Sequence, residues 1–408
     1  MAKIAERIKI VDVDTHIIEP YDLWTSRLGH KWDLLPHVER AVVPPGGFSG
    51  VMTVENDDIW VMGDEPAGQR ALLPVGVYGM AGYTHALPAH PQTIADIDPA
   101  GYDPDARLKI MDRYGIYAQI LYPNVGGFGA GGFLALKNDE LKADCVRAYN
   151  DFMTDWCSAD RKRLIPLTAT PFWDLDFALE EIERCAKLGH KGILFTWQPE
   201  GFGHPHLADP YWDPLWRLCT EYELPINFHV GSGIVTAPTI DYPGNGFAVN
   251  FAKSNVKASL SCAASVMEVI GSRIVRDFPT IKFVSVESGV GWIPFVLENM
   301  AWLWGTSGVY NERPDLRDTT PLELFKKHVF GTFWFEDACV EYAVDYLGAD
   351  NIMFETDFPH PTSVAPGPNT RAKNPIEHIE ERFSDTKMSA EDLEKILSGN
   401  AIKLYHLD

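Results

Sequence analysis

The chain has 408 residues, of which 46% are hydrophobic and 23% charged, and its formal net charge is −22. These are globular values, so the chain can bury a large core. The acidic balance would repel nucleic acid phosphates and anionic lipids, which excludes nucleic acid and membrane surfaces as expected partners. The six cysteines form no CxxC pair, and no apolar run reaches about 18 residues. We therefore expect a cytoplasmic protein without a disulfide framework or a thiolate zinc cluster.

Short apolar runs rich in β-branched residues alternate along the chain with longer helical patterns, which is typical of repeated βα units. Strands are expected at Ile8–Val13, Ala118–Tyr122, Leu164–Ala169, Gly192–Phe195, Pro225–Phe228, Ile281–Val286, Val329–Thr332 and Asn351–Glu355. Helices are expected at Pro104–Tyr114, Asn138–Ser158, Asp174–Leu188, Asp213–Glu223 and Asp337–Leu347. Eight such units predict an α/β fold of the closed (β/α)₈ TIM barrel type, in which helices cover a parallel sheet.

Two insertions interrupt this rhythm, and each follows an expected strand. The first spans residues 21–104 and includes an expected hairpin at Val51–Met62, and the second lies around Val230–Ser259. Loops that follow barrel strands lie on the C-terminal face, where ligands bind, so we expect the first insertion to cap that face. Residues 375–408 are expected to form helices packed against the outside of the barrel. Residues 1–408 are thus predicted to form a single domain.

Acids and histidines occur where several of the expected strands end, although a buried strand should be apolar. In the first strand, Asp14 and His16 are two residues apart and can both face the barrel mouth, while Val13 faces a helix. The carboxyl ends of all the strands lie at this mouth. The side chains expected around one point are Asp14, His16, His229, Glu287 and Asp357, with Glu19 and His360 in the adjoining loops.

Imidazoles and carboxylates around one point predict a divalent cation site. This mixture of ligands suits Zn²⁺, Mn²⁺ or Fe²⁺ better than Ca²⁺ or Mg²⁺, which prefer shells of oxygen alone. Without a cation, so many acids close together would repel one another and take up protons. The alternative is that each residue is a separate structural feature, because a single histidine at a strand end is more often a hydrogen-bonded core residue.

The chain resembles the amidohydrolase superfamily, and within it the amidohydrolase-related branch that includes aminocarboxymuconate-semialdehyde decarboxylase and γ-resorcylate decarboxylase. The resemblance rests on DVDTHIIEP at the first strand, the strand ending in His229, FVSVESGVGWIPF, FETDFPHP and GNAIKLY. It covers nearly the whole chain. It implies a (β/α)₈ barrel in which Asp14, His16, His229 and Asp357 hold a divalent metal below an activated water or ligand.

Two departures from the decarboxylases of this branch concern acidic residues. Glu287 stands where the resemblance implies a catalytic histidine, which weakens a direct transfer of decarboxylase activity. Glu19 follows the first-strand pair, so Glu19 and Glu287 together could bridge two metal ions about 3.5–4 Å apart. Alternatively, Glu19 caps the loop before Pro20, and Glu287 accepts hydrogen bonds from backbone amides.

Hydrolysis is the first hypothesis for the reaction, because a bound cation makes hydroxide available at neutral pH. The substrate would be a small carboxylic acid derivative, and Asp357 would move the proton with help from Glu287 or His360. The alternatives are a non-oxidative decarboxylase, a dinuclear iron or manganese oxygenase, and a partner subunit without catalytic activity. One or two ions per chain, and a homo-oligomer or hetero-oligomer, are compatible with the sequence.

Aromatic and amide side chains near the expected strand ends are candidates for the substrate pocket. These residues are Tyr122, Asn124, Trp197 and Trp292. The run Gly127–Gly132 fits the pattern G-x-G-x-x-G, but it starts too far after its strand for a dinucleotide site. We interpret it as a loop beside the pocket.

Overall fold

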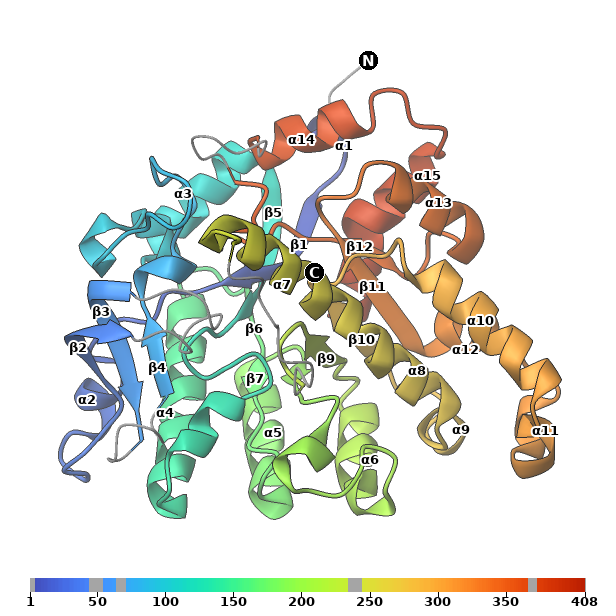
Figure 1. Cartoon of the computed structure of the whole chain (residues 1–408), viewed down its shortest axis with the longest axis horizontal. Helices are drawn as coiled ribbons and strands as arrows, with labels where there is room; N and C mark the ends of the chain where they lie inside the picture. The colour runs from blue at the N-terminus through green and yellow to red at the C-terminus, as the bar shows by residue number, and fades with distance from the viewer. Residues whose placement is uncertain (1–3, 44–53, 64–70, 234–243, 366–372, 408) are drawn as a thin grey trace.

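The computed structural model describes residues 4–43, 54–63, 71–233, 244–365 and 373–407. Figure 1 shows short strands in the middle of the molecule and helices around them. The strands of the barrel are β1 (Ile10–His16), β5 (Ile116–Tyr122), β6 (Leu164–Pro166), β7 (Thr168–Ala169), β8 (Ile193–Leu194), β9 (Ile226–His229), β10 (Phe283–Val286), β11 (Val329–Phe333) and β12 (Ile352–Phe354).

Parallel pairing joins these strands in chain order, so that their carboxyl ends share one face. β6 pairs with β5 and β7 pairs with β8, so these two pieces form one strand position and the ring has eight positions. The ring closes beyond β12, where Thr15 and Phe358 form a parallel bridge and the His16 amide donates to the Phe358 carbonyl at 2.6 Å. Each predicted strand overlaps an observed strand, which confirms the α/β barrel.

Most of the helices follow a strand and lie around the outside of the ring (Figure 1). Asn138 and Asp174 accept hydrogen bonds from the first turns of α4 and α5, as N-cap residues do. The helices are α1 (Ile4–Arg7), α2 (Leu23–Leu28), α3 (Pro104–Tyr114), α4 (Asp139–Cys157), α5 (Leu175–Leu188), α6 (Asp213–Glu221), α7 (Phe247–Ser261), α8 (Ala263–Gly271), α9 (Ile274–Asp277), α10 (Ile293–Thr306), α11 (Val309–Glu312), α12 (Pro321–His328), α13 (Ala338–Leu347), α14 (Pro375–Arg382), α15 (Ala390–Glu394) and α16 (Asn400–Leu404).

A bulge in β1 changes which side chains face the inside of the barrel. The pairing of β1 with β5 shifts register between Asp12 and Thr15. Val13 packs in the inner cluster formed by alternate residues of several strands, so it does not face a helix as the sequence predicted. The additional residue in the bulge lets Asp14 and His16 face inward directly above Val13.

The first insertion carries a three-stranded antiparallel sheet of β2 (His37–Val43), β3 (Val54–Met62) and β4 (Ala71–Pro74). The hairpin predicted at Val51–Met62 is wrong, because β3 is one strand from Val54 onward, and residues 51–53 lie outside the described residues. Asn56, with a φ of 57°, lies at a bulge where a turn was expected. Further along the insertion, the amides of Met80 and Ala81 donate to the carbonyl of Pro359 at the barrel mouth.

The end of the chain closes the opposite end of the barrel. α16 and the residues after it pack into the inner cluster with Val11 and Val13, rather than against the outside as predicted. The Tyr405 hydroxyl donates to Asn227 Oδ1 at 2.7 Å inside the ring. His406 Nε2 lies 3.8 Å from Oε2 of Glu223, which precedes β9. The end of the chain therefore covers the amino ends of the strands.

Candidate metal centre

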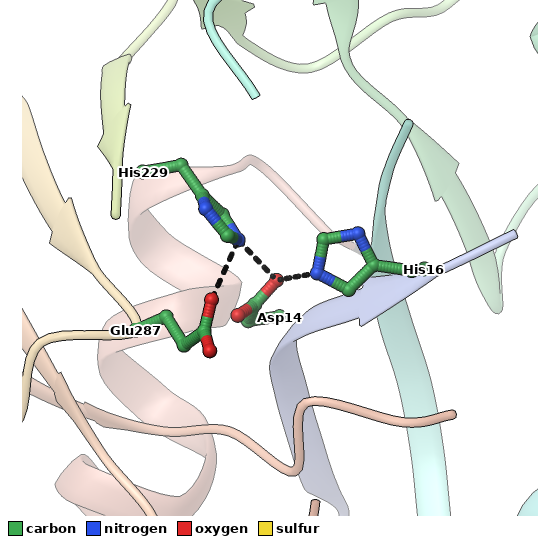
Figure 2. A group of neighbouring side chains, drawn as sticks. All are labelled: Asp14, His16, His229 and Glu287. Atoms are coloured by element: carbon green, nitrogen blue, oxygen red, sulfur yellow. Dashed lines mark ion pairs between the residues drawn. The ribbon is translucent and has the colours of Figure 1, made fainter. Parts of the chain in front are cut away.

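Two histidines and an aspartate meet at the carboxyl ends of the strands. Asp14 and His16 come from β1, and His229 is the last residue of β9. Asp14 Oδ1 lies 3.5 Å from His16 Nε2 and 3.4 Å from His229 Nε2 (Figure 2), and all three side chains are fully buried. Ligands at about 2.1 Å from one tetrahedral ion are about 3.4 Å apart, so these edges fit a shared cation.

Glu287 directly follows β10, Asp357 is the third residue after β12, and both complete the cluster. His229 Nε2 is 3.5 Å from Glu287 Oε2, and His16 Nε2 is 3.5 Å from Asp357 Oδ1. Both acids have left-handed backbone conformations, with φ values of 53° and 57°. Such conformations are uncommon for residues other than glycine and are concentrated at functional sites. They turn the two carboxylates into the mouth at the points where the strands end.

The remote nitrogens of His16 and His229 are held by backbone carbonyls. His16 Nδ1 lies 3.3 Å from the Pro123 oxygen, and His229 Nδ1 lies 2.8 Å from the Val230 oxygen. Donation to these oxygens places the proton on Nδ1 and directs the Nε2 lone pair at the centre, as in metal-bound histidines. Burial also lowers the pKa of His16 well below its ordinary value. Burial acts in the same direction on His229, but the charges of Asp14 and Glu287 outweigh it and raise that pKa.

Buried polar atoms without a hydrogen-bond partner converge on this point. A buried polar atom without a partner costs several kcal/mol, so such atoms are rare unless a ligand satisfies them. The ligand atoms of Asp14, His16, His229 and Glu287 lie within 4.8 Å of one another, which fits a divalent cation. Within the part of the chain that the structure describes, the atoms without partners here are Asp14 Oδ1 and Oδ2, His16 Nε2, His229 Nε2 and Asp357 Oδ1.

The cluster carries more negative charge than the fold alone can stabilise. Burial, with a contribution from Asp357, raises the pKa of Glu287 well above its ordinary value, and burial with the Asp14 charge does the same for Glu355 and Asp357. Glu355 Oε1 is also buried, and no described residue is its hydrogen-bond partner. A divalent cation would supply the positive charge that these carboxylates lack.

Asp12 lies behind the centre and forms structural hydrogen bonds. Its carboxylate accepts from the Thr356 amide and hydroxyl at 2.8 and 2.6 Å and from the Gln119 amide at 3.0 Å. Arg107, which is fully buried, donates to Gln119 and to the carbonyl of His16, at 3.2 and 2.6 Å. These hydrogen bonds hold β1 against the segment after β12, which carries Asp357.

Glu19, a predicted metal ligand, lies apart from the other candidates. Its Oε1 accepts hydrogen bonds from the amides of Asn124 and Val125, at 2.8 and 3.0 Å, and from the Tyr149 hydroxyl at 2.7 Å. Among the described residues, the groups whose atoms converge closely enough for a metal do not include Glu19. Its carboxylate therefore holds the loop after β5.

Two of the four predicted substrate-binding residues, Tyr122 and Asn124, form hydrogen bonds that support the centre. Tyr122 is fully buried beneath the centre, and its hydroxyl donates to Asn227 Oδ1 at 3.0 Å. Asn124 donates to the carbonyl of Ile17 at 2.8 Å and accepts from His360 Nε2 at 2.7 Å. Both side chains thus support the centre from within.

Trp197 and Trp292 differ in their polar contacts. Trp197 is buried, and none of the described residues offers its indole nitrogen a hydrogen-bond partner. Trp292 is partly buried, and its indole nitrogen donates to the carbonyl of Ser288 at 2.9 Å. An indole donor that remains available is the kind of group that binds a polar atom of a substrate.

Sequence reasoning missed two aromatic side chains beside the histidines. The Phe128 ring lies 4.3 Å from the ring of His229 and 5.1 Å from that of His16, between centroids. Phe128 belongs to the glycine-rich run, where a Cβ on Gly129 would approach Ser232 to 2.9 Å, so the loop packs very closely against its neighbours. The ring of Tyr78, from the first insertion, lies 5.4 Å from the ring of His360, between centroids. Proximity to a histidine cannot be read from local sequence.

The ring of parallel strands and the ligand cluster at their carboxyl ends identify the molecule as a (β/α)₈ barrel with a metal centre. The sequence matches the amidohydrolase family over residues 11–407, so the chain belongs to that family, as the motifs predicted. Among the described residues, no helix has the length and hydrophobicity needed to cross a bilayer.

Several known proteins are similar to this chain. The γ-resorcylate decarboxylase of Polaromonas sp. strain JS666 is 26% identical over 315 residues, which cover 74% of this chain and 87% of that protein. The structure of an amidohydrolase from Mycobacterium avium subsp. paratuberculosis K-10 covers 98% of both chains, with a TM-score of 0.66 and 20% identity. A dihydroxybenzoic acid decarboxylase from Polaromonas sp. JS666, solved with manganese and 2-nitroresorcinol, has a TM-score of 0.60 and 17% identity and covers 98% of this chain and 97% of its own. These structures share the fold.

Proposed function

We propose that the chain is a metal-dependent, non-oxidative decarboxylase that acts on a small aromatic carboxylic acid. The observation that carries this proposal is the set of buried ligand atoms of Asp14, His16, His229 and Asp357, which lack partners and converge beneath aromatic side chains. The similarity to γ-resorcylate decarboxylases supports this alternative over the hydrolase that the sequence first suggested. Manganese in a neighbour of the same fold supports a divalent cation at this place.

A divalent cation held by Asp14, His16, His229 and Asp357 would act as a Lewis acid toward the oxygens of an aromatic acid. Phe128 packs against both metal-centre histidines and is partly exposed, so it can place a flat ring above the centre and exclude water. The Trp197 indole, which lacks a hydrogen-bond partner among the described residues, is the candidate donor to a polar substituent of that ring.

Glu287 is the best placed proton donor in this proposal. Its side chain is 9% exposed, whereas those of Asp14, His16, His229 and Asp357 are fully buried. Burial and the neighbouring Asp357 raise its pKa, which favours a carboxyl group that holds a proton. As the bond between the ring and the carboxylate breaks, CO₂ leaves and the ring carbon takes the proton from Glu287.

The test is to incubate the Mn²⁺-loaded protein with 2,6-dihydroxybenzoate and other ortho-hydroxybenzoates. We expect one CO₂ for each arene formed, no consumption of O₂, and one deuteron on the ring in D₂O. A product that carries oxygen from water would instead indicate a hydrolase. Consumption of O₂ that depends on the substrate would indicate an oxygenase, and assembly with a partner without any turnover would indicate the non-catalytic subunit.

A further inference from the structure

A cavity of about 760 Å³ lies at the amino ends of the barrel strands, opposite the metal centre. The segments that precede β9, β10, β11 and β12 line it, together with the end of the chain. Pockets of about 300–1,000 Å³ are the usual size for sites that bind small organic molecules. Because barrel enzymes carry their chemistry at the carboxyl ends of the strands, a ligand in this cavity would be separate from the reacting substrate.

Lysines are concentrated in this cavity, although acidic residues outnumber basic ones by 57 to 35 in the chain. The lysines that line it are Lys282, Lys326, Lys395 and Lys403. Lys395 Nζ lies 3.0 Å from Asp350 Oδ1 and is thus paired. The other three ammonium groups form no ion pair with any residue that the structure describes. Their charge is therefore available to a ligand.

The two carboxylates that line the cavity do not balance these lysines. Asp350 is the partner of Lys395, and Glu223 Oε2 lies 3.8 Å from His406 Nε2. Four lysines against two carboxylates leave an excess of two positive charges in the lining. In a protein with a net charge of −22, such an excess is the opposite of what the composition would produce by chance.

Lys282 shows that the positive charges repel one another. It is partly buried, and burial together with the charges of Lys403 and Lys327 lowers its pKa. Its Nζ donates to the carbonyl of Lys327, so two of its three donors remain for another acceptor. A bound anion would offset the repulsion and accept these hydrogen bonds.

Apolar side chains line the cavity alongside the lysines. Leu224, Ile281 and Leu404 are buried, and Phe330 is partly buried. An inorganic anion would leave these side chains in contact with water, whereas a ligand with an apolar body would cover them. The lining therefore suits an organic anion.

One wall of the cavity has an unusual backbone that is held in place. Lys395–Gly399 is a π-helical turn, and both of its end residues line the cavity. Such turns are rare and occur frequently at functional sites. Asn400, which follows the turn, donates to the carbonyls of Ala349 and Ile352 at 2.6 and 2.8 Å. These bonds fix the wall to β12, so the site is formed before a ligand binds.

We propose that this cavity binds a small organic anion that has at least two negative charges and an apolar body, such as a phosphate ester or a dicarboxylate. Lys282, Lys326 and Lys403 bind the charged groups, and the apolar side chains contact the body. The ligand joins the segments before four neighbouring strands to the end of the chain, so its binding stabilises the folded barrel. The proposal depends on neither the metal nor decarboxylation.

The test is isothermal titration calorimetry of the full-length, Mn²⁺-loaded protein with phenyl phosphate and with phthalate. Benzyl alcohol, which is aromatic but neutral, is the ligand control. The variant is Lys326→Gln/Lys403→Gln, in which both side chains are exposed, so their replacement leaves the packing intact. The matched control is Lys109→Gln/Lys162→Gln, which removes the same charge at two exposed lysines outside the cavity. Circular dichroism establishes that each protein is folded.

The metal centre could bind the same anions, so the titrations are repeated on Asp14→Asn. This variant removes a ligand of the metal centre and leaves the cavity unchanged. An anion that binds Lys326→Gln/Lys403→Gln as tightly as the wild type, but does not bind Asp14→Asn, would lie at the metal centre and would overturn the proposal.

We expect at least one of the two anions to bind one site per chain, with a dissociation constant below about 1 mM. The affinity should be the same in Lys109→Gln/Lys162→Gln and in Asp14→Asn, and about tenfold or more weaker in Lys326→Gln/Lys403→Gln. The anion that binds more tightly identifies the ligand as a phosphate ester or a dicarboxylate.

Three further results would overturn the proposal. These are the absence of binding by both anions, equally tight binding of benzyl alcohol, and a wild-type dimer without anion binding that dissociates in Lys326→Gln/Lys403→Gln. The last result would assign the lysines to the acidic surface of a second copy. Turnover enters none of these measurements, so this proposal and the proposed function can fail independently.

Discussion

Buried polar groups are hydrogen-bonded at one end of the barrel interior and unpaired at the other. Beneath the metal centre, on the side of the chain end, Asn227 Oδ1 accepts from the hydroxyls of Tyr122 and Tyr405, at 3.0 and 2.7 Å. The Asn227 amide donates to the carbonyls of Ile193 and Pro225, at 3.1 and 3.2 Å. Every polar group of this small network is thus paired, and the network joins the end of the chain to the barrel.

At the carboxyl ends, the polar groups are equally buried but face one another without partners. The described residues form no hydrogen bonds with Asp14 Oδ1 or Oδ2, His16 Nε2 or His229 Nε2. Glu287 and Asp357 have left-handed backbone conformations. Groups paired within the protein stabilise the fold, whereas groups left unpaired raise its free energy until a ligand binds. The difference between the two ends therefore separates the stabilising region from the functional one.

Asp14→Asn should give the largest effect and should separate function from stability. The amide removes the charge of one metal ligand. Mutation of residues that only hold such ligands in place typically lowers metal affinity by roughly 10–100-fold. We therefore expect Asp14→Asn to lower the affinity for Mn²⁺ by more than this and to abolish turnover. In chelator-treated protein the same change removes one of several adjacent like charges. The free energy of unfolding of the metal-free form should therefore rise by about 1 kcal/mol.

Metal content by mass spectrometry and urea denaturation in the presence of a chelator measure the two effects. Asp318→Asn, at an exposed position, removes the same charge outside the cluster and should leave both quantities unchanged. A metal-free Asp14→Asn protein less stable than the wild type would mean that Asp14 stabilises the fold, and the contrast between the two ends would fail.

Glu287→Gln tests the proton donor within the same cluster. The side chain retains its shape but cannot donate a proton as an acid, so turnover of the aromatic acid should fall by about 10²–10⁴-fold. The metal centre keeps Asp14, His16, His229 and Asp357 and should still bind Mn²⁺. Steady-state kinetics with parallel metal analysis checks this prediction, and a variant with wild-type turnover would remove Glu287 from the proposed role.

The sequence predicted the strands and the residues at their ends because both depend on local patterns. Hydrophobic runs of β-branched residues marked each barrel strand, and polar residues at their carboxyl ends marked Asp14, His16, His229, Glu287 and Asp357. The hairpin at Val51–Met62 was predicted wrongly, because Asn56 can occupy either a turn or a bulge and only the pairing with β2 decides between them.

The contacts that the sequence could not give all join distant segments. Glu19 was predicted as a ligand from its place near the first strand, but three donors from the segments after β5 and in α4 hold its carboxylate. Phe128 was part of a loop expected beside the pocket, and only the fold places its ring against His229. The ring of His360 reaches His16 for the same reason.

Glu336, near the barrel mouth, should make the free energy of unfolding depend on pH, and this effect is smaller than those above. Its Oε1 accepts from the amides of Val290 and Gly291 at 2.7 and 2.9 Å, and its buried Oε2 has no partner among the residues that the structure describes. Burial raises its pKa from 4.5 to about 7 in the folded protein. The folded state therefore binds the proton more tightly, and the associated stability is present below about pH 4.5 and is lost as the pH rises through about 7.

Glu336→Gln should remove this dependence while keeping an acceptor for both amides. Between about pH 4.5 and pH 8, the wild type should lose about 3 kcal/mol more stability than the variant, because each pKa unit corresponds to about 1.4 kcal/mol. Urea denaturation of both proteins across this range measures the difference. Parallel stability curves for the two proteins would show that the ionised carboxylate is as well accommodated as the neutral one.

Tyr405→Phe tests the paired end and should have the smallest effect. The substitution removes one donor to Asn227 Oδ1, which keeps the hydroxyl of Tyr122 as its partner. We expect the free energy of unfolding to fall by about 1 kcal/mol, the usual net contribution of one buried hydrogen bond, with unchanged metal content and turnover. Denaturation in urea and metal analysis on the same preparation make the comparison. If Tyr405→Phe changed the metal content, the two ends would be coupled through Tyr122, whose ring lies 5.0 Å from that of His229, and the paired end would then have a role in function as well.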